Sequence, residues 1–300
     1  FFMSHFVIRG GKPLDGAVSV SGAKNSVLPI LAATLLSGGR STLHNCPDLR
    51  DVRSALDILR HLGCKAERQG STVTVDSSVV DRWDVPHELM REMRSSVIFL
   101  GPILARCGRA RLSLPGGCDI GQRPIDLHLS ALRKLGTVIR EQGGDILCEA
   151  NDLQGRDIIL SFPSVGATEN TLLTATACSG VTRIINAARE PEIADLQEFL
   201  RKAGALVSGG GESVITVSGT TPRRDVEHTI LPDRIEAATF LCAAAACGGE
   251  VTLTGVEPEH VGTVIQCLRD GGCAVRSAGR TITLLAPQRL GSMPTVRTMP

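Results

Sequence analysis

The chain has 300 residues with 42% hydrophobic content, which is enough for a sizeable core and favours two domains. Its 32 basic and 31 acidic residues nearly cancel, so bulk charge indicates neither a nucleic-acid-binding nor a membrane-surface protein. The ten cysteines include no CxxC pair and mostly lie among apolar residues, which predicts a reducing compartment, by default the cytoplasm.

Four copies of one pattern of elements follow one another along the chain. An Ala- and Leu-rich helix comes first, then a short β-branched strand, a second helix, and two strands joined by a Gly-rich turn. A strand before the first helix would make each copy a βαβαββ unit. One unit cannot bury both its sheet and its helices, so we expect the units to pack together. The four first helices are predicted over Val27–Leu36, Val97–Ala105, Thr171–Cys178 and Ala237–Ala246.

Each second helix is predicted to end at a shared signature, Leu-Arg-x-x-Gly. Its leucines are Leu59, Leu132, Leu200 and Leu268, at intervals of 73, 68 and 68 residues. The glycine suits the C′ position that closes a helix.

The segment Pro222–Leu231 interrupts the pattern after the third copy and is polar enough to be a linker. Three units would then form one domain, and the fourth would begin another. The sequence stops at Pro300, one unit into that second domain.

The segment Ser21–Pro29, SGAKNSVLP, places Lys24 and Asn25 where the first helix begins. An ammonium group beside the free N–H groups of a helix N-terminus makes an anion site. A solvated lysine with Asn25 as the N-cap explains the same residues equally well. Arg94 precedes the second unit's helix in the same way, and a surface salt bridge is its plainer explanation.

The segment Leu114–Leu127, LPGGCDIGQRPIDL, contains three glycines, which suits a loop that closes over a ligand. Cys118 lies in this loop five positions before Arg123, whose charge favours the nucleophilic thiolate. Asp119 opposes that effect, and a surface cysteine without a role is the alternative. The histidines show no ligand spacing such as HExxH, so we expect no metal site.

Five motifs in this order resemble the UDP-N-acetylglucosamine 1-carboxyvinyltransferases, the enolpyruvyl transferases of peptidoglycan synthesis. The resemblance covers essentially the whole chain. The motifs are SGAKNSVLP from Ser21, LPGGCDIGQRPIDLH from Leu114, PSVGATEN from Pro163, AAREPEI from Ala187 and LPDRIE from Leu231.

The resemblance implies an α/β fold, an inside-out α/β barrel of six βαβαββ units in two three-unit domains. Residues 22–231 would be the first domain, with three units, the uridine site and the cysteine loop. Residues 1–21, which contribute an N-terminal strand, and residues 232–300 would form an incomplete second domain, with two units absent.

The resemblance also implies the site residues. Cys118 would be the catalytic proton donor, and phosphoenolpyruvate would contact Lys24, Asn25 and Arg123. The residues implied for UDP-N-acetylglucosamine are Asn25, Arg94, Arg123, Pro124, Ile125, Asp126, Leu127, Phe162, Pro163, Ser164 and Val165.

The implied reaction adds the sugar 3-hydroxyl to phosphoenolpyruvate and then eliminates phosphate. The family's aspartate that deprotonates the hydroxyl, and further arginines, would lie beyond Pro300, so we expect this chain alone to turn over weakly or not at all. The alternative is a non-catalytic UDP-N-acetylglucosamine-binding fragment or paralogue. An interaction scaffold built on the same repeats has little in its favour.

The implied partners are the two small-molecule substrates, without a cofactor, and we expect a monomer. The nearly neutral charge argues against nucleic acid. The longest apolar stretch, residues 237–247, is about half as long as a bilayer-spanning helix, so we expect no membrane partner.

Overall fold

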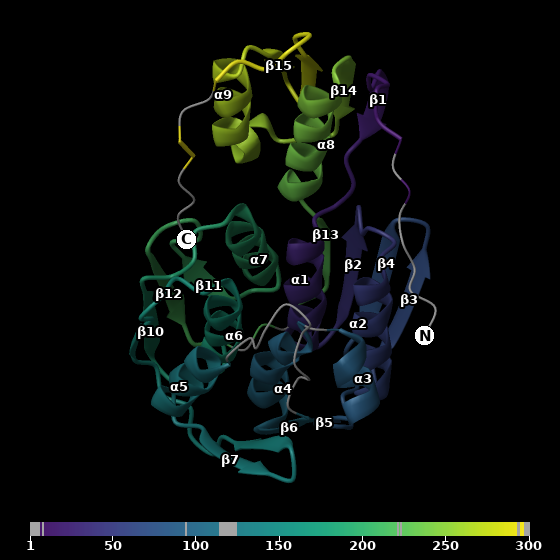
Figure 1. The fold of residues 1–300 in the computed structure, drawn as a ribbon. Helices are drawn as coiled ribbons and strands as arrows, with labels where there is room; N and C mark the ends of the chain where they lie inside the picture. The colour runs from purple at the N-terminus through teal and green to yellow at the C-terminus, as the bar shows by residue number, and fades with distance from the viewer. Residues whose placement is uncertain are drawn as a thin grey trace. The chain divides into compact units, whose positions relative to one another are not determined.

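The computed structural model of the chain describes residues 7, 9–93, 95–113, 125–220, 222, 224–292 and 295–296. The chain divides into two compact units, shown in Figure 1. The larger unit is Gly22–Leu231, and the smaller unit combines Phe1–Ser21 with Pro232–Met299. Each unit has a hydrophobic core of its own.

The described strands of the larger unit form three four-stranded sheets with one shared topology. In each sheet one edge strand pairs in parallel with its neighbour, and the other two pairings are antiparallel. The first sheet has the order β13(Val226–Thr229)-β2(Arg40–His44)-β4(Thr72–Asp76)-β3(Lys65–Gln69). The second has the order β5(Asp84–Val85)-β6(Arg109–Ser113)-β8(Asp145–Glu149)-β7(Val138–Gln142). The third has the order β9(Asp157–Ile159)-β10(Val181–Ile185)-β12(Val214–Ser218)-β11(Leu206–Ser208).

The strands bury every second side chain, as their sequences predict. In β4, Val73 and Val75 are fully buried while the intervening threonine is partly exposed. In β12, Ile215 and Val217 alternate in the same way. Period-two burial means that one face of each sheet packs on the core and the other faces solvent.

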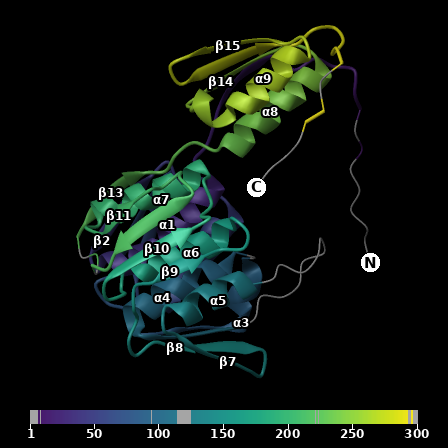
Figure 2. The ribbon, with the colours of Figure 1, turned by 90° about the vertical axis from the view of Figure 1, so that its left-hand side faces the viewer.

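The helices of the larger unit pack against one another and against its sheets, and they are of two kinds (Figures 1 and 2). In each repeat of the larger unit the first helix is mainly apolar and is buried for most of its length, although that of the third repeat also carries Glu169 and Asn170. The second helix of each repeat is amphipathic, with charged residues on its outer face. The buried set is α1(Lys24–Ser37), α4(Leu100–Cys107) and α6(Val165–Ala175); the amphipathic set is α2(Arg50–His61), α5(Asp126–Lys134) and α7(Pro191–Lys202). The short α3(His87–Glu92) and the 3₁₀ turn η1(Ser96–Phe99) precede α4.

The Leu-Arg-x-x-Gly signature ends each second helix as predicted. In α2, Gly63 has a φ of 103° at the C′ position, and its N–H donates to Arg60 O. The N–H of Cys64 donates back to Leu59 O, which completes a Schellman motif. The same pair of hydrogen bonds recurs in the three later copies, so the repeated leucine is the residue whose carbonyl closes the helix.

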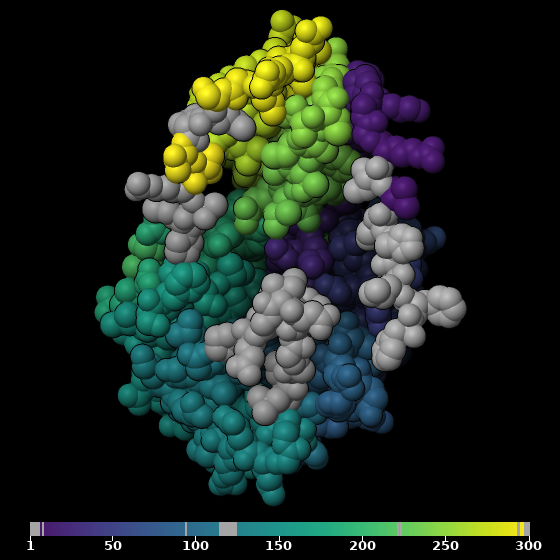
Figure 3. Space-filling model, in the orientation of Figure 1, coloured from purple at the N-terminus to yellow at the C-terminus, as the bar shows by residue number. Residues whose placement is uncertain are grey.

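The described strands of the smaller unit form a sheet with the same topology, in the order β1(Gly16–Ser19)-β14(Glu250–Thr254)-β16(Thr281–Leu285)-β15(Ala274–Ala278). Its helices are α8(Arg234–Cys247) and α9(Gly262–Asp270), with the 3₁₀ turn η2(Pro258–Val261) between β14 and α9. Helix α8, in light green, forms part of the surface seen in Figure 3. Its exposed residues are Ile235, Thr239, Cys242, Ala246 and Cys247, and the first four form one stripe along the helix.

The strands that precede α1 and α8 are exchanged between the repeats. β1 precedes α1 in the sequence but pairs with β14, and β13 precedes α8 but pairs with β2. The interpretation of Pro222–Leu231 as a linker is therefore wrong for residues 226–229. Val226 and His228 are buried and the two residues between and after them are exposed, which is the burial pattern of a strand.

One predicted helix is shifted. The third buried helix was expected over Thr171–Cys178, but α6 spans Val165–Ala175. The hydroxyl of Ser164 accepts a hydrogen bond from Ala167 N at 3.4 Å, so the helix begins earlier than its apolar run.

Candidate active site

The predicted anion-binding residues lie in the first turn of α1. Lys24 and Asn25 are both exposed, and the N-cap residue is Ala23, so the interpretation of Asn25 as the N-cap is wrong. The Lys24 ammonium lies 3.4 Å from Asp51 Oδ2 on α2, and 45% and 32% of these side chains are exposed. A half-exposed ion pair of this kind is weak, so a multiply charged anion can displace the carboxylate.

Behind these residues, the first turn of α1 is joined to α7 and β13. The hydroxyl of Ser26 donates to Asp195 Oδ2, and His228 Nε2 lies 3.0 Å from Asp195 Oδ1. Ser26 and His228 are buried, as is most of the Asp195 side chain. Buried polar groups require partners, and here each one satisfies the others.

The predicted uridine residues that the structure describes lie at the starts of two helices. Ile125, Asp126 and Leu127 are at the start of α5, and Asp126 is exposed. Residues 162–165 lead into α6, where Phe162 is 51% exposed and Ser164 is the N-cap.

The two helix starts are held together by His128, which follows Leu127 on α5. Its Nδ1 lies 2.8 Å from Asn170 Nδ2 on α6. A Cβ added to Gly166 would lie 2.9 Å from His128 Cε1, so only glycine allows this approach. Burial lowers the pKa of His128 to about 4, with the Asp126 carboxylate opposing, so the ring is neutral at pH 7. Nδ1 therefore accepts from the Asn170 amide.

Asn170 also connects helix α4 to α5 and α6. Its Oδ1 accepts from Gly101 N at 2.8 Å, and its Nδ2 also donates to Val97 O at 3.0 Å. These contacts tie α6 to the start of α4. Because Asn170 is fully buried, its loss would leave the groups on both sides without partners.

A buried acidic group lies beside Asn170. Glu169 is 6% exposed, and its pKa is raised well above the ordinary value by burial and by the carboxylates of Glu192 and Glu190. Glu190 and Glu192 belong to the AAREPEI motif at the start of α7.

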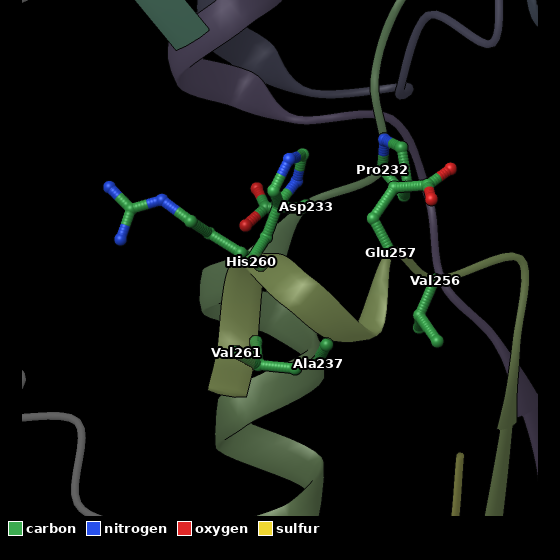
Figure 4. Close-up of a pocket in the computed structure, with 8 residues that line it drawn as sticks. Pro232, Asp233, Ala237, Val256, Glu257, His260 and Val261 are labelled. Carbon is green, nitrogen blue, oxygen red and sulfur yellow. The ribbon is translucent and has the colours of Figure 1, made fainter. Parts of the chain in front are cut away.

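Two hollows of the described structure lie elsewhere. A cavity of about 360 Å³ lies at the C-terminal ends of α1, α4 and α6. A small pocket of the smaller unit, drawn in Figure 4, lies between the start of α8 and η2. Neither is lined by a predicted site residue. The first is lined by Leu36, Gly38, Ser78, Ala105, Arg106, Thr176 and Ala177. The second is lined by Pro232, Asp233, Arg234, Ala237, Val256, Glu257, His260 and Val261.

Comparison with known proteins identifies the family. The family described as EPSP synthase (3-phosphoshikimate 1-carboxyvinyltransferase) matches residues 8–300. The chain belongs to this family.

Individual relatives narrow the assignment. A UDP-N-acetylglucosamine 1-carboxyvinyltransferase 2 of Caldanaerobacter subterraneus subsp. tengcongensis is 48% identical over 99% of this chain and 72% of its own length. A UDP-N-acetylglucosamine 1-carboxyvinyltransferase 1 of Symbiobacterium thermophilum is 50% identical over 98% of this chain and 68% of its own length. The resemblance found in the sequence motifs is confirmed, and the chain is a member of the UDP-N-acetylglucosamine 1-carboxyvinyltransferases, a group of enzymes.

Solved structures of enolpyruvyl transferases confirm the predicted inside-out α/β fold. The enolpyruvyl transferase NikO from Streptomyces tendae superposes with a TM-score of 0.84 at 26% identity, over 94% of this chain and 68% of that one. An EPSP synthase from Acinetobacter baumannii has the same fold, with a TM-score of 0.68 at 20% identity over 92% of this chain.

Several predicted site residues of this family member lie outside the described residues: Arg94, Cys118, Arg123 and Pro124. Within the described part, no three His, Cys, Asp or Glu residues gather as metal ligands. No described helix is long and apolar enough to cross a membrane.

Sequence reasoning missed four polar residues near the candidate site, three of which, His128, Asn170 and Asp195, make the hydrogen bonds that join its elements. The fourth is Glu169. Glu169 and Asn170 carried a usable signal, because a charged and an amide side chain inside an otherwise apolar helix need buried partners. Asp195 carried none, since its partners lie 169 and 33 residues away.

Proposed function

We propose that this chain transfers the enolpyruvyl group of phosphoenolpyruvate to the 3-hydroxyl of UDP-N-acetylglucosamine and releases phosphate. The observation that carries the proposal is the 48–50% identity to two relatives of that name, over nearly the whole chain. We place the reaction in the cytoplasm, as the first committed step of peptidoglycan synthesis. The proposed protein is a monomer that uses two small-molecule substrates and no cofactor.

For the sugar nucleotide, the proposal uses the starts of α5 and α6. Ile125, Asp126 and Leu127 would form one wall of the uridine site, and residues 162–165 the other. The contact between His128 and Gly166 supports this, because it fixes the spacing of the two helices that carry the walls. The exposed ring of Phe162 offers an apolar face on which a base can stack.

For phosphoenolpyruvate, the proposal uses Lys24 and Asn25. The ammonium group and the positive end of the α1 dipole would act on the same anion. The Lys24–Asp51 ion pair is half exposed and is therefore replaceable by the substrate phosphate.

The roles of the remaining residues rest on the resemblance. Cys118 would donate the proton to the enol carbon of phosphoenolpyruvate. Arg123 would bind phosphate groups and line the uridine site together with Pro124. Arg94 would contact the nucleotide sugar.

The reaction would proceed by addition and elimination. A proton adds to the methylene carbon of phosphoenolpyruvate, which makes the adjacent carbon electrophilic. The sugar 3-hydroxyl attacks that carbon and loses its proton, giving a tetrahedral intermediate. The intermediate then loses a proton from the methyl group and expels phosphate, which re-forms the double bond. Fixed cations stabilise the phosphate and carboxylate throughout.

Calorimetry and a phosphate-release assay test the proposal. The wild-type chain should bind UDP-N-acetylglucosamine, and Lys24→Ala should weaken phosphoenolpyruvate binding at least tenfold. Lys65→Ala is the matched control, because it removes one exposed lysine from β3 of the same unit. Equal effects of the two substitutions would contradict the role of Lys24.

The same assays decide between turnover and binding alone. Weak phosphate release is the expectation for this polypeptide by itself. Heat of nucleotide-sugar binding without any phosphate release would favour a non-catalytic UDP-N-acetylglucosamine-binding protein. Absence of UDP-N-acetylglucosamine binding would overturn both hypotheses.

A further inference from the structure

One buried carboxylate, that of Asp195 on α7, collects hydrogen bonds from three separate parts of the larger unit. It accepts from the hydroxyl of Ser26 on α1 and from Leu231 N at 3.3 Å, and it pairs with His228 Nε2 on β13 at 3.0 Å. Only 11% of its side chain is exposed. A carboxylate with this many donors is firmly oriented.

The orientation of His228 is fixed from its other side. The Lys202 ammonium lies 3.4 Å from His228 Nδ1, and a lysine can only donate. Nδ1 is therefore the acceptor, and Nε2 carries the hydrogen that is donated to Asp195. The ring of Phe199 packs edge-on against the imidazole, with centroids 5.8 Å apart and an interplanar angle of 88°. The ring can neither flip nor exchange its roles without losing these contacts.

Asp195 holds the start of α1 by two routes. The first is the direct hydrogen bond from Ser26, the third residue of the helix. The second runs through Leu231, whose N–H donates to Asp195 and whose carbonyl accepts from Ala23 N at 2.8 Å. Ala23 is the N-cap residue of α1. Lys24 and Asn25 lie between the two attachment points.

The start of α1 lacks the usual local means of fixing a helix N-terminus. No side chain caps α1 at Ala23, and its first turn contains no acidic residue. Helix α8 is different, because its N-cap Asp233 accepts from Ile235 N and Glu236 N. In α1 the negative group that complements the helix dipole comes from another helix, so the first turn offers its exposed face to an external anion.

We propose that Asp195 is a positioning residue that fixes the first turn of α1, and with it the placement of Lys24 and Asn25 toward phosphoenolpyruvate. The inference rests on the proposed function for its ligand. The fixing of the turn itself rests only on the hydrogen bonds of Ser26 and Leu231 to Asp195 and of Ala23 to Leu231.

The test compares Asp195→Asn and Ser26→Ala with a matched control. Asp195→Asn keeps the side-chain shape but removes one acceptor oxygen. Ser26→Ala removes only the direct link to α1 and places a good helix former in the turn, so it should fold. Glu198→Gln, on the exposed face of the same helix α7, removes one negative charge elsewhere.

The first readout is backbone hydrogen exchange of residues 24–28, measured without any ligand. Both test variants should accelerate this exchange about tenfold relative to residues 32–36, and the control should not. Unchanged exchange in Asp195→Asn would overturn the inference, whatever the substrate proves to be. This readout is independent of the proposed function.

The second readout is the ratio of two affinities, measured by calorimetry on the full chain. Phosphoenolpyruvate binding, in the presence of UDP-N-acetylglucosamine, should weaken about tenfold in both test variants. The affinity for UDP-N-acetylglucosamine should change several-fold less than that for phosphoenolpyruvate, because its proposed walls are on α5 and α6 and, of its implied contacts, Asn25 alone lies in the first turn of α1. Equal weakening of both ligands would show a general structural role and contradict positioning. If the wild-type chain binds no phosphoenolpyruvate, the proposed function fails, and the exchange experiment still decides whether Asp195 fixes the turn.

Discussion

Helices α1 and α8 occupy the same place in their repeats and are both apolar on all sides, but their surroundings differ. Of the 14 residues of α1, 12 are buried, whereas 4 of the 14 residues of α8 are. Helix α1 packs against α2, α4 and α7, whereas the described helical contacts of α8 are with α9 and η2. Composition therefore shows which environment a helix suits, and its neighbours determine how much of it is buried.

The largest difference is expected for equivalent truncations in the two helices. Ile30→Ala in α1 should lower the free energy of unfolding by about 3 kcal/mol, because the side chain is fully buried and leaves a cavity. Ile235→Ala in α8 should cost less than about 0.5 kcal/mol, because 49% of Ile235 is exposed.

Denaturant unfolding measures both effects. Trp83 is the single tryptophan of the chain and packs on the core of the larger unit, so its fluorescence reports on Ile30→Ala. Circular dichroism follows Ile235→Ala. Equal losses in the two variants would contradict the comparison.

The next largest effect concerns the reactivity of cysteine thiols, compared between α8 and the core of the larger unit. Cys242 and Cys247 of α8 are exposed, whereas Cys46, Cys64 and Cys148 are buried and burial raises the pKa of each to about 12. At pH 7.5 the α8 thiols should be alkylated at least about a hundredfold faster, since the buried ones need both local opening and deprotonation. Peptide mass spectrometry after timed labelling measures the rates. Labelling in 6 M urea is the control, because the difference should vanish there.

Acid should weaken the larger unit through His128. Its pKa is about 4 in the folded chain and about 6.5 when unfolded, so the unfolded state binds the proton first as the pH falls. This contribution to stability is present above pH 6.5 and should decrease by about 2 kcal/mol between pH 7 and pH 5. Glu169 acts in the opposite direction, because its raised pKa stabilises the folded state as the pH falls.

His128→Gln isolates the histidine. The glutamine can still bond Asn170 but does not titrate, so the loss between pH 7 and pH 5 should be smaller by that amount. Urea unfolding followed by Trp83 fluorescence at both pH values measures it. An identical pH dependence in the variant and the wild type would exclude His128 as the cause.

The last comparison is between two glycines, one crowded and one in open space. A Cβ at Gly101 would lie 2.6 Å from Asn170 O, so Gly101→Ala should destabilise the α4–α6 contact by about 2 kcal/mol. A Cβ at Gly262 in α9 meets nothing within 4 Å, so Gly262→Ala should stabilise the smaller unit by about 0.5 kcal/mol. Thermal unfolding should show opposite signs. A destabilising Gly262→Ala would mean that the start of α9 is more crowded than described.

The sequence predicted best the features of the fold that depend on residues close together in the chain. The Leu-Arg-x-x-Gly signature located four helix ends because a Schellman motif needs only residues within one turn of each other. The strand at residues 226–229 was missed because one of its two buried residues, His228, is polar. Its partners, Asp195 and Lys202, lie on a helix distant in the sequence.

In the candidate site, too, features set by neighbouring residues were predictable, whereas contacts between residues distant in the sequence were not. The placement of Lys24 and Asn25 at a helix start was predictable from the motif around them. The capping role considered for Asn25 was wrong, because Ala23 takes that place and the stabilising carboxylate comes from Asp195. Side chains that act across 33 to 169 residues have no local pattern by which a single sequence can reveal them.

The pairing of β13 with β2 sets the order in which the larger unit can be completed during protein synthesis. β2 lies near the beginning of this unit and β13 at its end. Until residues 226–229 have left the ribosome, β2 has one unpaired edge, and such edges are sites of aggregation. The nascent chain must therefore carry an open sheet through most of the synthesis of this unit, and chaperones that shield strand edges should matter most during that interval.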